Sequence, residues 1–73
     1  MNKLKEYRNI LGETQQESAE RLNISISKYQ KAEQGIQGVS DSLKIKMANH
    51  FNTSVGVLFF GENITYSDKK VTN

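Results

Sequence analysis

The segment from Thr14 to Gly35 constrains the fold more than any other part of the chain, and it reads TQQESAERLNISISKYQKAEQG. Glu17 follows Thr14 at the spacing of a capping box. In that motif the hydroxyl accepts a backbone N–H near the helix start, and the carboxylate accepts the N–H of the capping residue. A helix is therefore predicted to begin here. Ala19 and Leu22 fall on one side of it, and we expect both to face the core.

A tight turn follows this helix. Asn23 stands where a left-handed residue must end the helix, and asparagine tolerates that backbone conformation better than most side chains. Ile24 is apolar within a polar turn, so we expect it to fill the angle between two helices. Ser25 is suited to cap the second helix and Gly35 to end it. Two capped helices joined by so short a turn predict a helix-turn-helix.

The second helix of this pair has a polar outer face. At about 100° per residue, an arc of about 140° contains Ile26, Ser27, Gln30, Lys31 and Gln34. The opposite side carries Tyr29, Ala32 and Glu33. An isolated surface helix can show the same pattern. Next to a capped partner helix, however, the pattern favours a helix that reads DNA base edges in the major groove.

Two further helices are predicted with buried faces. Residues 3–11, which precede Gly12, place three apolar side chains at helical spacing, namely Leu4, Tyr7 and Leu11. Ser40 is suited to cap a later helix. The expected buried stripe of that helix comprises Leu43, Met47, Ala48 and Phe51. Asn52 and Thr53 are expected to end it.

The segment SVGVLFFG then carries more apolar surface than one short helix can bury beneath itself. Ser54 is suited to cap this helix and Gly61 to end it. Three side chains are expected to face the core, namely Val55, Leu58 and Phe59. Val57 and Phe60 are in excess, and we expect them to contact another such domain. Ordinary packing within the chain is the alternative.

The length bounds the architecture. The chain has 73 residues, 36% of them hydrophobic and 25% charged, which is enough for one small domain. We expect an all-α domain of five helices over residues 1–61. Residues 62–73 are expected to form a polar, mobile tail, with a short strand around Ile64–Tyr66 as the alternative.

Composition excludes several classes of function. Without cysteine there is no disulfide framework and no thiolate metal site, and we expect no cofactor. The single histidine, His50, has no acid–base partner at a suggestive spacing, so we expect a solvated side chain and no enzymatic activity. No signal peptide or membrane span is recognised, which favours a cytoplasmic protein. The net charge of +2 and a pI of about 9.0 mildly favour nucleic acid as a partner.

Together these segments resemble the Cro and phage-repressor (XRE-type) family of helix-turn-helix regulators. The likeness covers Leu4 to about Gly61 and implies a compact five-helix fold of the lambda-repressor type with sequence-specific DNA binding. Its most specific positions lie at helix starts, in the turn and at helix ends. They are Leu4, Arg8, Thr14, Gln15, Ala19, Ile24, Ser25, Glu33, Gly35, Ala48, Phe51 and Leu58.

The resemblance also implies roles for single residues. Gln15 matches a position that grips a phosphate together with the helix start. Arg8 and Glu33 match a charged pair that ties the first helix to the end of the recognition helix. The positions that face base edges are matched by Ile26, Ser27 and Lys31, with Gln30 beside them. From base-edge chemistry we expect Lys31 to face guanine, Gln30 adenine, Ser27 either base, and Ile26 a thymine methyl.

Further phosphate contacts are expected from residues whose side chains carry no sequence information. These are Lys28, Ser40 and Lys44.

The chain departs from the family pattern in its core. Large or apolar residues are usual at the positions of Ser18, Ala32, Asp41 and Lys44. Cores accept substitutions that keep the total volume and patterning. We therefore expect the lost volume to be restored by Tyr7, Tyr29, Met47 and Phe51.

The expected partner is an operator in double-stranded DNA. A homodimer would place two recognition helices about 34 Å apart and select a palindrome. The alternative is a small protein-interaction regulator, an anti-repressor or antitoxin, that binds a repressor or another protein. The exposed Ile26, the surplus apolar residues near Phe60 and the modest charge favour this alternative, whereas Gln15, Ser27 and Lys31 favour DNA.

Overall fold

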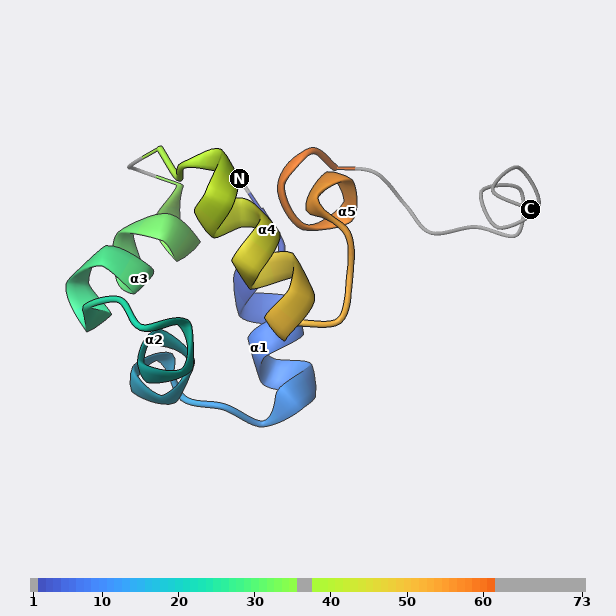
Figure 1. Cartoon of the computed structure of the whole chain (residues 1–73). Helices are drawn as coiled ribbons and strands as arrows, with labels where there is room; N and C mark the ends of the chain where they lie inside the picture. Colours follow the sequence, from blue (N-terminus) through green and yellow to red (C-terminus); the bar gives the residue numbers. More distant parts are fainter. Residues whose placement is uncertain (1, 36–37, 62–73) are drawn as a thin grey trace.

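The computed structural model describes residues 2–35 and 38–61, and this part of the chain is all-helical. It contains five helices, α1 (Leu4–Leu11), α2 (Gln15–Leu22), α3 (Ile26–Gln34), α4 (Asp41–His50) and α5 (Val55–Phe59) (Figure 1). The expectation of an all-α, five-helix domain is confirmed for these residues. The expected tail over 62–73, including the alternative strand, lies outside the described residues.

Hydroxyl side chains begin four of the helices, as predicted. Thr14 Oγ1 accepts the N–H of Glu17 at 3.1 Å, and the Glu17 carboxylate accepts the N–H of Thr14 at 2.8 Å. Both halves of the capping box are therefore present. Three helices have a serine cap. The side chain of each serine accepts the backbone N–H of the residue three positions later, and the caps are Ser25, Ser40 and Ser54.

Left-handed residues follow the ends of α2 and α3. Asn23 has φ 60° and Gly35 has φ 73°, the conformation that glycine and asparagine adopt at least cost. After Asn23, the N–H of Ile24 donates to the carbonyl of Ala19 at 3.0 Å, which closes the last turn of α2. Asn52, with φ 56°, plays the same part after α4. The predicted helix ends are confirmed at these positions.

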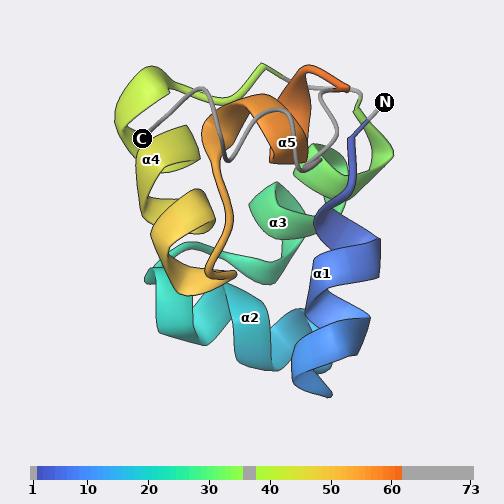
Figure 2. The same cartoon turned by 90° about the vertical axis from the view of Figure 1, so that its right-hand side faces the viewer.

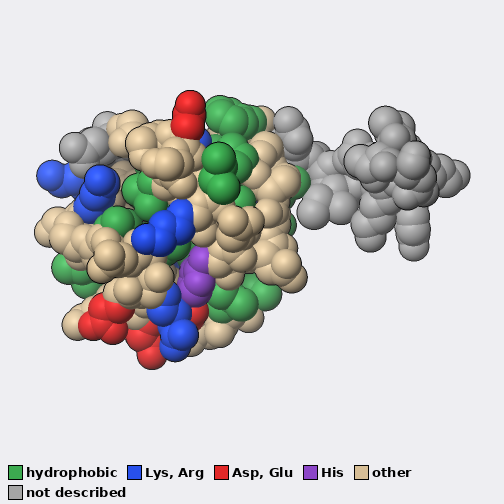
Figure 3. All heavy atoms as spheres, in the orientation of Figure 1, with side chains coloured by type: hydrophobic (Ala, Val, Ile, Leu, Met, Phe, Trp, Pro, Cys, Tyr) green, Lys and Arg blue, Asp and Glu red, His purple; other side chains and the backbone are tan. Residues whose placement is uncertain are grey.

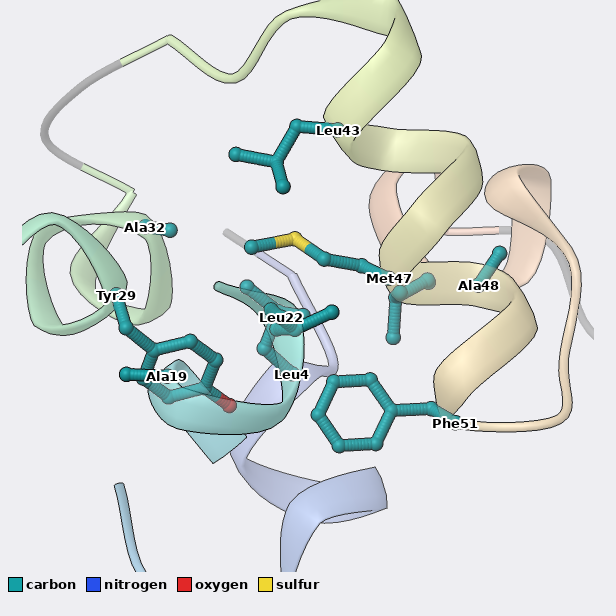
Figure 4. Close-up of a cluster of buried hydrophobic side chains, with 10 residues drawn as sticks. Leu4, Ala19, Leu22, Tyr29, Ala32, Leu43, Met47, Ala48 and Phe51 are labelled. Atoms are coloured by element: carbon teal, nitrogen blue, oxygen red, sulfur yellow. The ribbon is translucent and has the colours of Figure 1, made fainter. Parts of the chain in front are cut away.

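The core lies where α1, α2, α3 and α4 converge. Figure 4 shows Tyr29 of α3 and Leu22 of α2 directed toward Met47 of α4 and toward Phe51, with Leu4 of α1 among them. All five side chains are at most 2% exposed. Tyr29, Met47 and Phe51 are large members of this cluster, and Tyr7 packs against it.

The apolar stripe of α1 is shorter than predicted. Leu4 is buried, but Leu11 is 45% exposed and its neighbour Ile10 is 70% exposed. The prediction that Leu11 faces the core is wrong. Figure 2 shows the end of α1 at the lower edge of the molecule.

The chain start secures α1 and α3 to each other. Asn2 Nδ2 donates to the carbonyl of Ala32 at 2.7 Å, and Asn2 Oδ1 accepts the N–H of Leu4 at 3.0 Å. The N–H of Lys3 donates to the carbonyl of Leu58 at 2.9 Å, which adds α5 to the same junction. Among the described residues, no helix has the length and apolarity needed to cross a bilayer.

Candidate nucleic-acid interface

The buried side of α3 fixes the direction in which its other side points. Tyr29 and Ala32 are 0% and 3% exposed, and they pack against Ala19 and Leu22 of α2 in one cluster. Ile24 in the turn packs against the same cluster, as predicted. The contact holds α3 by a narrow apolar strip and leaves Ile26, Ser27, Lys28, Lys31 and Gln34 exposed.

The outer side of α3 presents most of the predicted base-reading residues. Ile26 is 39% exposed, and Ser27 and Lys31 are also exposed. Gln34 and the predicted phosphate contact Lys28 are exposed as well. Figure 3 shows lysine or arginine side chains on the side of the molecule where α3 lies.

Gln30 is half-buried, unlike the other predicted base-reading residues, because its side-chain amide is hydrogen-bonded to α2. Gln30 Nε2 donates to Gln15 Oε1 at 3.1 Å, and Gln15 Nε2 donates to Glu33 Oε1 at 3.0 Å. Gln30 is predicted from the sequence as a base reader and Gln15 as a phosphate contact, and the bond between the two side chains was not predicted. The structure brings the two side chains together at the junction of α2 and α3.

The predicted ion pair closes this junction. Arg8 Nε lies 2.6 Å from Glu33 Oε2, and the two side chains are only 11% and 6% exposed. Arg8 Nη1 also donates to the carbonyl of Glu13 at 2.9 Å. Such a pair fixes the geometry of α1 against α3 more than it adds net stability, because both charges have lost water.

The electrostatics of the pair follow from its hydrogen bonds. Burial alone would raise the pKa of Glu33, but hydrogen bonding to Arg8 and Gln15 outweighs burial, so the pKa lies below its ordinary value of 4.5. The same contact raises the pKa of Arg8. Both groups are therefore charged at neutral pH.

Tyr29 contributes its ring to the core beside this pair. Its hydroxyl is buried without a hydrogen-bond partner in residues 2–35 and 38–61. Burial and the neighbouring Glu33 raise the pKa of this phenol, so it is neutral.

The remaining predicted phosphate contacts fare differently. The side chain of Gln15 is hydrogen-bonded within the protein. The groups at the start of α2 that can bind an anion are therefore its first backbone N–H groups, which have no acceptor inside the helix. Ser40 is exposed, but its Oγ already accepts the N–H of Leu43 at 3.3 Å as the cap of α4.

Lys44 does not extend freely into solvent. Its side chain is 22% exposed, and Nζ lies 5.0 Å from the ring centre of Phe60 and 5.8 Å from that of Phe59. Asp41 Oδ1 is 4.0 Å away. A hollow of about 190 Å³ beside Lys44 reaches Ala32 and is also lined by Phe60. Lys44 thus packs against α5 by cation–π contacts.

A second polar cluster was not predicted from the sequence. Glu13 Oε1 accepts the hydroxyl of Ser18 at 2.6 Å and lies 2.9 Å from His50 Nε2, while Arg21 Nε lies 3.2 Å from Glu13 Oε2. The expectation of a solvated His50 without an acidic partner is wrong, since its side chain is 20% exposed and touches this carboxylate. The pair is separated by 37 residues, so no local spacing reveals it.

The same cluster explains the polar residue in the core. Ser18 is 0% exposed, and its hydroxyl is satisfied by Glu13. Burial alone would raise the pKa of Glu13. Hydrogen bonds to Ser18 and His50 more than compensate, and the pKa lies below its ordinary value.

The predicted partner interface is only half present. Val57 is 5% exposed and belongs to the interior, so its assignment to a partner surface is wrong. α5 turns Val57 and Leu58 inward, while Val55 and Phe59 are half-buried against the core. Phe60, directly after the helix, is 63% exposed.

Comparison with protein-family models, with curated proteins and with solved structures finds no match to this chain.

The outer surface of α3 is rich in groups that can form hydrogen bonds. It offers two exposed ammonium groups, hydroxyl and amide groups and one aliphatic side chain. Within residues 2–35 and 38–61, no group of three or more histidine or acidic side chains is arranged to hold a metal ion.

Proposed function

We propose that this protein is a sequence-specific DNA-binding transcriptional regulator of the Cro and phage-repressor type, in which α3 enters the major groove. The observation that carries the proposal is the accessible outer side of α3. There Ile26, Ser27 and Lys31 are exposed, opposite the buried Tyr29 and Ala32. A short helix presented in this way against a second capped helix is the arrangement of helix-turn-helix readers.

Charge on α3 supports the same function. Lys28 and Lys31 are exposed, whereas the single acidic residue of the helix, Glu33, is buried against Arg8. The charge that α3 offers outward is therefore positive. Phosphate oxygens and the acceptor atoms of guanine both attract such groups.

The proposal assigns distinct roles along the unit. Lys31 reads guanine, Ser27 either base and Ile26 a thymine methyl, with Gln30 beside them. Lys28 and the backbone N–H groups at the start of α2 bind phosphates and set the register. The protein acts in the cytoplasm, and two copies joined near Phe60 would read a palindromic operator.

Selection from random DNA tests the proposal. We expect enrichment of one operator at low salt, followed by a loss of about 1 to 3 kcal/mol at one operator position in Lys31→Ala. In Lys28→Ala, binding should weaken by a similar factor for all sequences and the salt slope should fall by about 1. Lys5→Ala removes the same charge from an exposed position on α1 and serves as the control.

Two results would contradict the proposal. One is the absence of any enriched sequence at low salt. The other is an equal loss on operator and random DNA for Lys31→Ala.

A protein-interaction regulator is the second candidate, as an anti-repressor or antitoxin. It is favoured by exposed apolar side chains that a DNA reader does not need, since Phe60 is 63% and Ile45 55% exposed. Figure 3 shows hydrophobic side chains grouped over α4 and α5. Patches of this kind mark protein contacts. Selection without an enriched operator would favour this candidate.

A further inference from the structure

We propose that Glu33 determines which base Gln30 reads, although Glu33 itself does not face the DNA. The inference rests on the proposed function, and it deepens it by assigning a positioning role to a residue on the buried side of α3. It follows from the direction of three hydrogen bonds that connect Arg8, Glu33, Gln15 and Gln30 in series.

The series begins at a group that can only accept. An ionised carboxylate has no hydrogen to donate. Glu33 Oε2 accepts from Arg8 Nε at 2.6 Å, and Glu33 Oε1 accepts from Gln15 at 3.0 Å. Gln15 must therefore turn its NH2 group, and not its carbonyl oxygen, toward Glu33.

This orientation is passed on to the next amide. With its NH2 group facing Glu33, Gln15 presents its carbonyl oxygen to Gln30, and Gln30 Nε2 donates to it at 3.1 Å. Gln30 must in turn direct its NH2 group inward. The negative charge of Glu33 thus sets the orientation of both amides. A group at position 33 that could both donate and accept would allow either orientation.

The outward groups of Gln30 follow directly. One carbonyl oxygen and one N–H remain, and this pair of acceptor and donor matches N6–H and N7 of adenine. The reversed amide would offer two N–H groups outward, which match the two acceptors O6 and N7 of guanine. Glu33 therefore favours adenine over guanine at the position that Gln30 reads.

Burial makes the orienting group dependable. The side chains of Arg8 and Glu33 are 11% and 6% exposed, so little water competes for the carboxylate. The hydrogen bonds lower the pKa of Glu33, which keeps the acceptor ionised at neutral pH.

The test compares base preferences at a selected operator. The position read by Gln30 is located by Gln30→Ala, and dissociation constants for A·T and G·C at that position are then measured at one salt concentration. The native chain should prefer adenine by about 5- to 150-fold, the range of one bidentate contact. Glu33→Gln should lose most of this preference, since an amide accepts and donates, while random-DNA affinity stays at that of Glu6→Gln. The latter removes an exposed carboxylate of α1.

A charge exchange supplies the opposite polarity. In Arg8→Glu/Glu33→Lys, residue 33 can only donate, so both amides turn over and two N–H groups of Gln30 face outward. We expect the preference at this position to change from adenine to guanine.

A measurement without DNA separates the inference from the function. In nitrogen–proton correlation spectra, Glu33→Gln should shift the side-chain NH2 signals of both Gln15 and Gln30, although Gln30 does not bond to residue 33. An unchanged Gln30 signal in a folded Glu33→Gln overturns the inference even if an operator is found. Full retention of the adenine preference in Glu33→Gln does the same, as does insensitivity of every operator position to Gln30→Ala. If selection yields no operator at all, the proposed function fails and the reading role of Gln30 fails with it, whatever the spectra show.

Discussion

Ser18 illustrates how a single polar atom is accommodated in this small core. Its side chain is fully buried, and the hydroxyl donates to Glu13 at 2.6 Å. A hydrogen bond to a charged group stabilises the folded state more than one between neutral groups. A carboxylate that is shielded from water and loses a donor destabilises the folded state. Ser18 therefore holds Glu13 in place for His50 and Arg21.

We expect Ser18→Ala to lower the free energy of unfolding by about 1 to 3 kcal/mol, because Glu13 loses its shortest hydrogen bond. Urea unfolding followed by circular dichroism measures this change. Ser27→Ala, an exposed position on α3, is the control and should stay within about 0.5 kcal/mol of the native chain. Equal stability of the two variants would show that the Ser18 hydroxyl contributes nothing to the cluster.

At the scale of residues, the sequence was informative wherever the interaction is local. The caps at Thr14 and Ser25 and the left-handed Asn23 join groups a few positions apart, so their chemistry is visible in the order of residues. The contact of Glu13 with His50 spans 37 positions and depends on how α4 lies against α2. The Arg8–Glu33 pair, also distant in sequence, was expected only through the family resemblance.

At the scale of helices, two partly buried carboxylates join elements that are far apart in sequence. Glu33 connects α3 to α1 through Arg8 and to α2 through Gln15. Glu13, in the connection between α1 and α2, reaches α2 through Ser18 and α4 through His50. The packing of four helices therefore depends on two negative charges.

These carboxylates predict a loss of stability in acid. The pKa of each is lowered by folding from an ordinary value of 4.5, so the unfolded chain binds more protons as the pH falls through this range. The free energy of unfolding should fall below about pH 4.5, at up to about 1.4 kcal/mol per pH unit for each carboxylate.

Urea unfolding at a series of pH values measures this dependence. Glu33→Gln should show a shallower decline than the native chain, whereas Glu6→Gln, at an exposed position, should follow the native slope. Identical slopes for the native chain and Glu33→Gln would mean that the pKa of Glu33 is not lowered by folding.

The length of a helix decided whether its buried face could be predicted. α4 spans ten residues, and its predicted stripe of Leu43, Met47 and Ala48 is buried as expected. α5 has only five residues, too few for a repeating pattern. The sequence therefore could not show that Val57 is more buried than Phe59. In α1 the error at Leu11 arose because packing ends before the helix does.

At the scale of the whole molecule, the exposed Phe60 is the remaining part of the predicted partner surface. It follows α5 directly, and Lys44 Nζ lies 5.0 Å from its ring centre. With Val57 buried, Phe60 is the residue of the predicted partner surface on which self-association would depend.

We expect the native chain to sediment as a dimer at high concentration and Phe60→Ser to sediment as a monomer, because the substitution removes the exposed ring. Ile10→Ser, which removes an apolar side chain that is 70% exposed near the end of α1, is the control and should leave the association unchanged. A native monomer at high concentration would exclude self-association through this surface.

The helices within residues 2–35 and 38–61 are short, and the longest of them, α4, has ten residues. Isolated helices below about 12 to 15 residues are marginal in water even with good caps. The exposed side of α3 therefore forms only in the folded domain, since a peptide of the same residues would be mostly coil. A ligand that binds α3 will therefore stabilise the folded state of the whole domain. It will also slow hydrogen exchange of the backbone amide of Leu58, which is distant from α3.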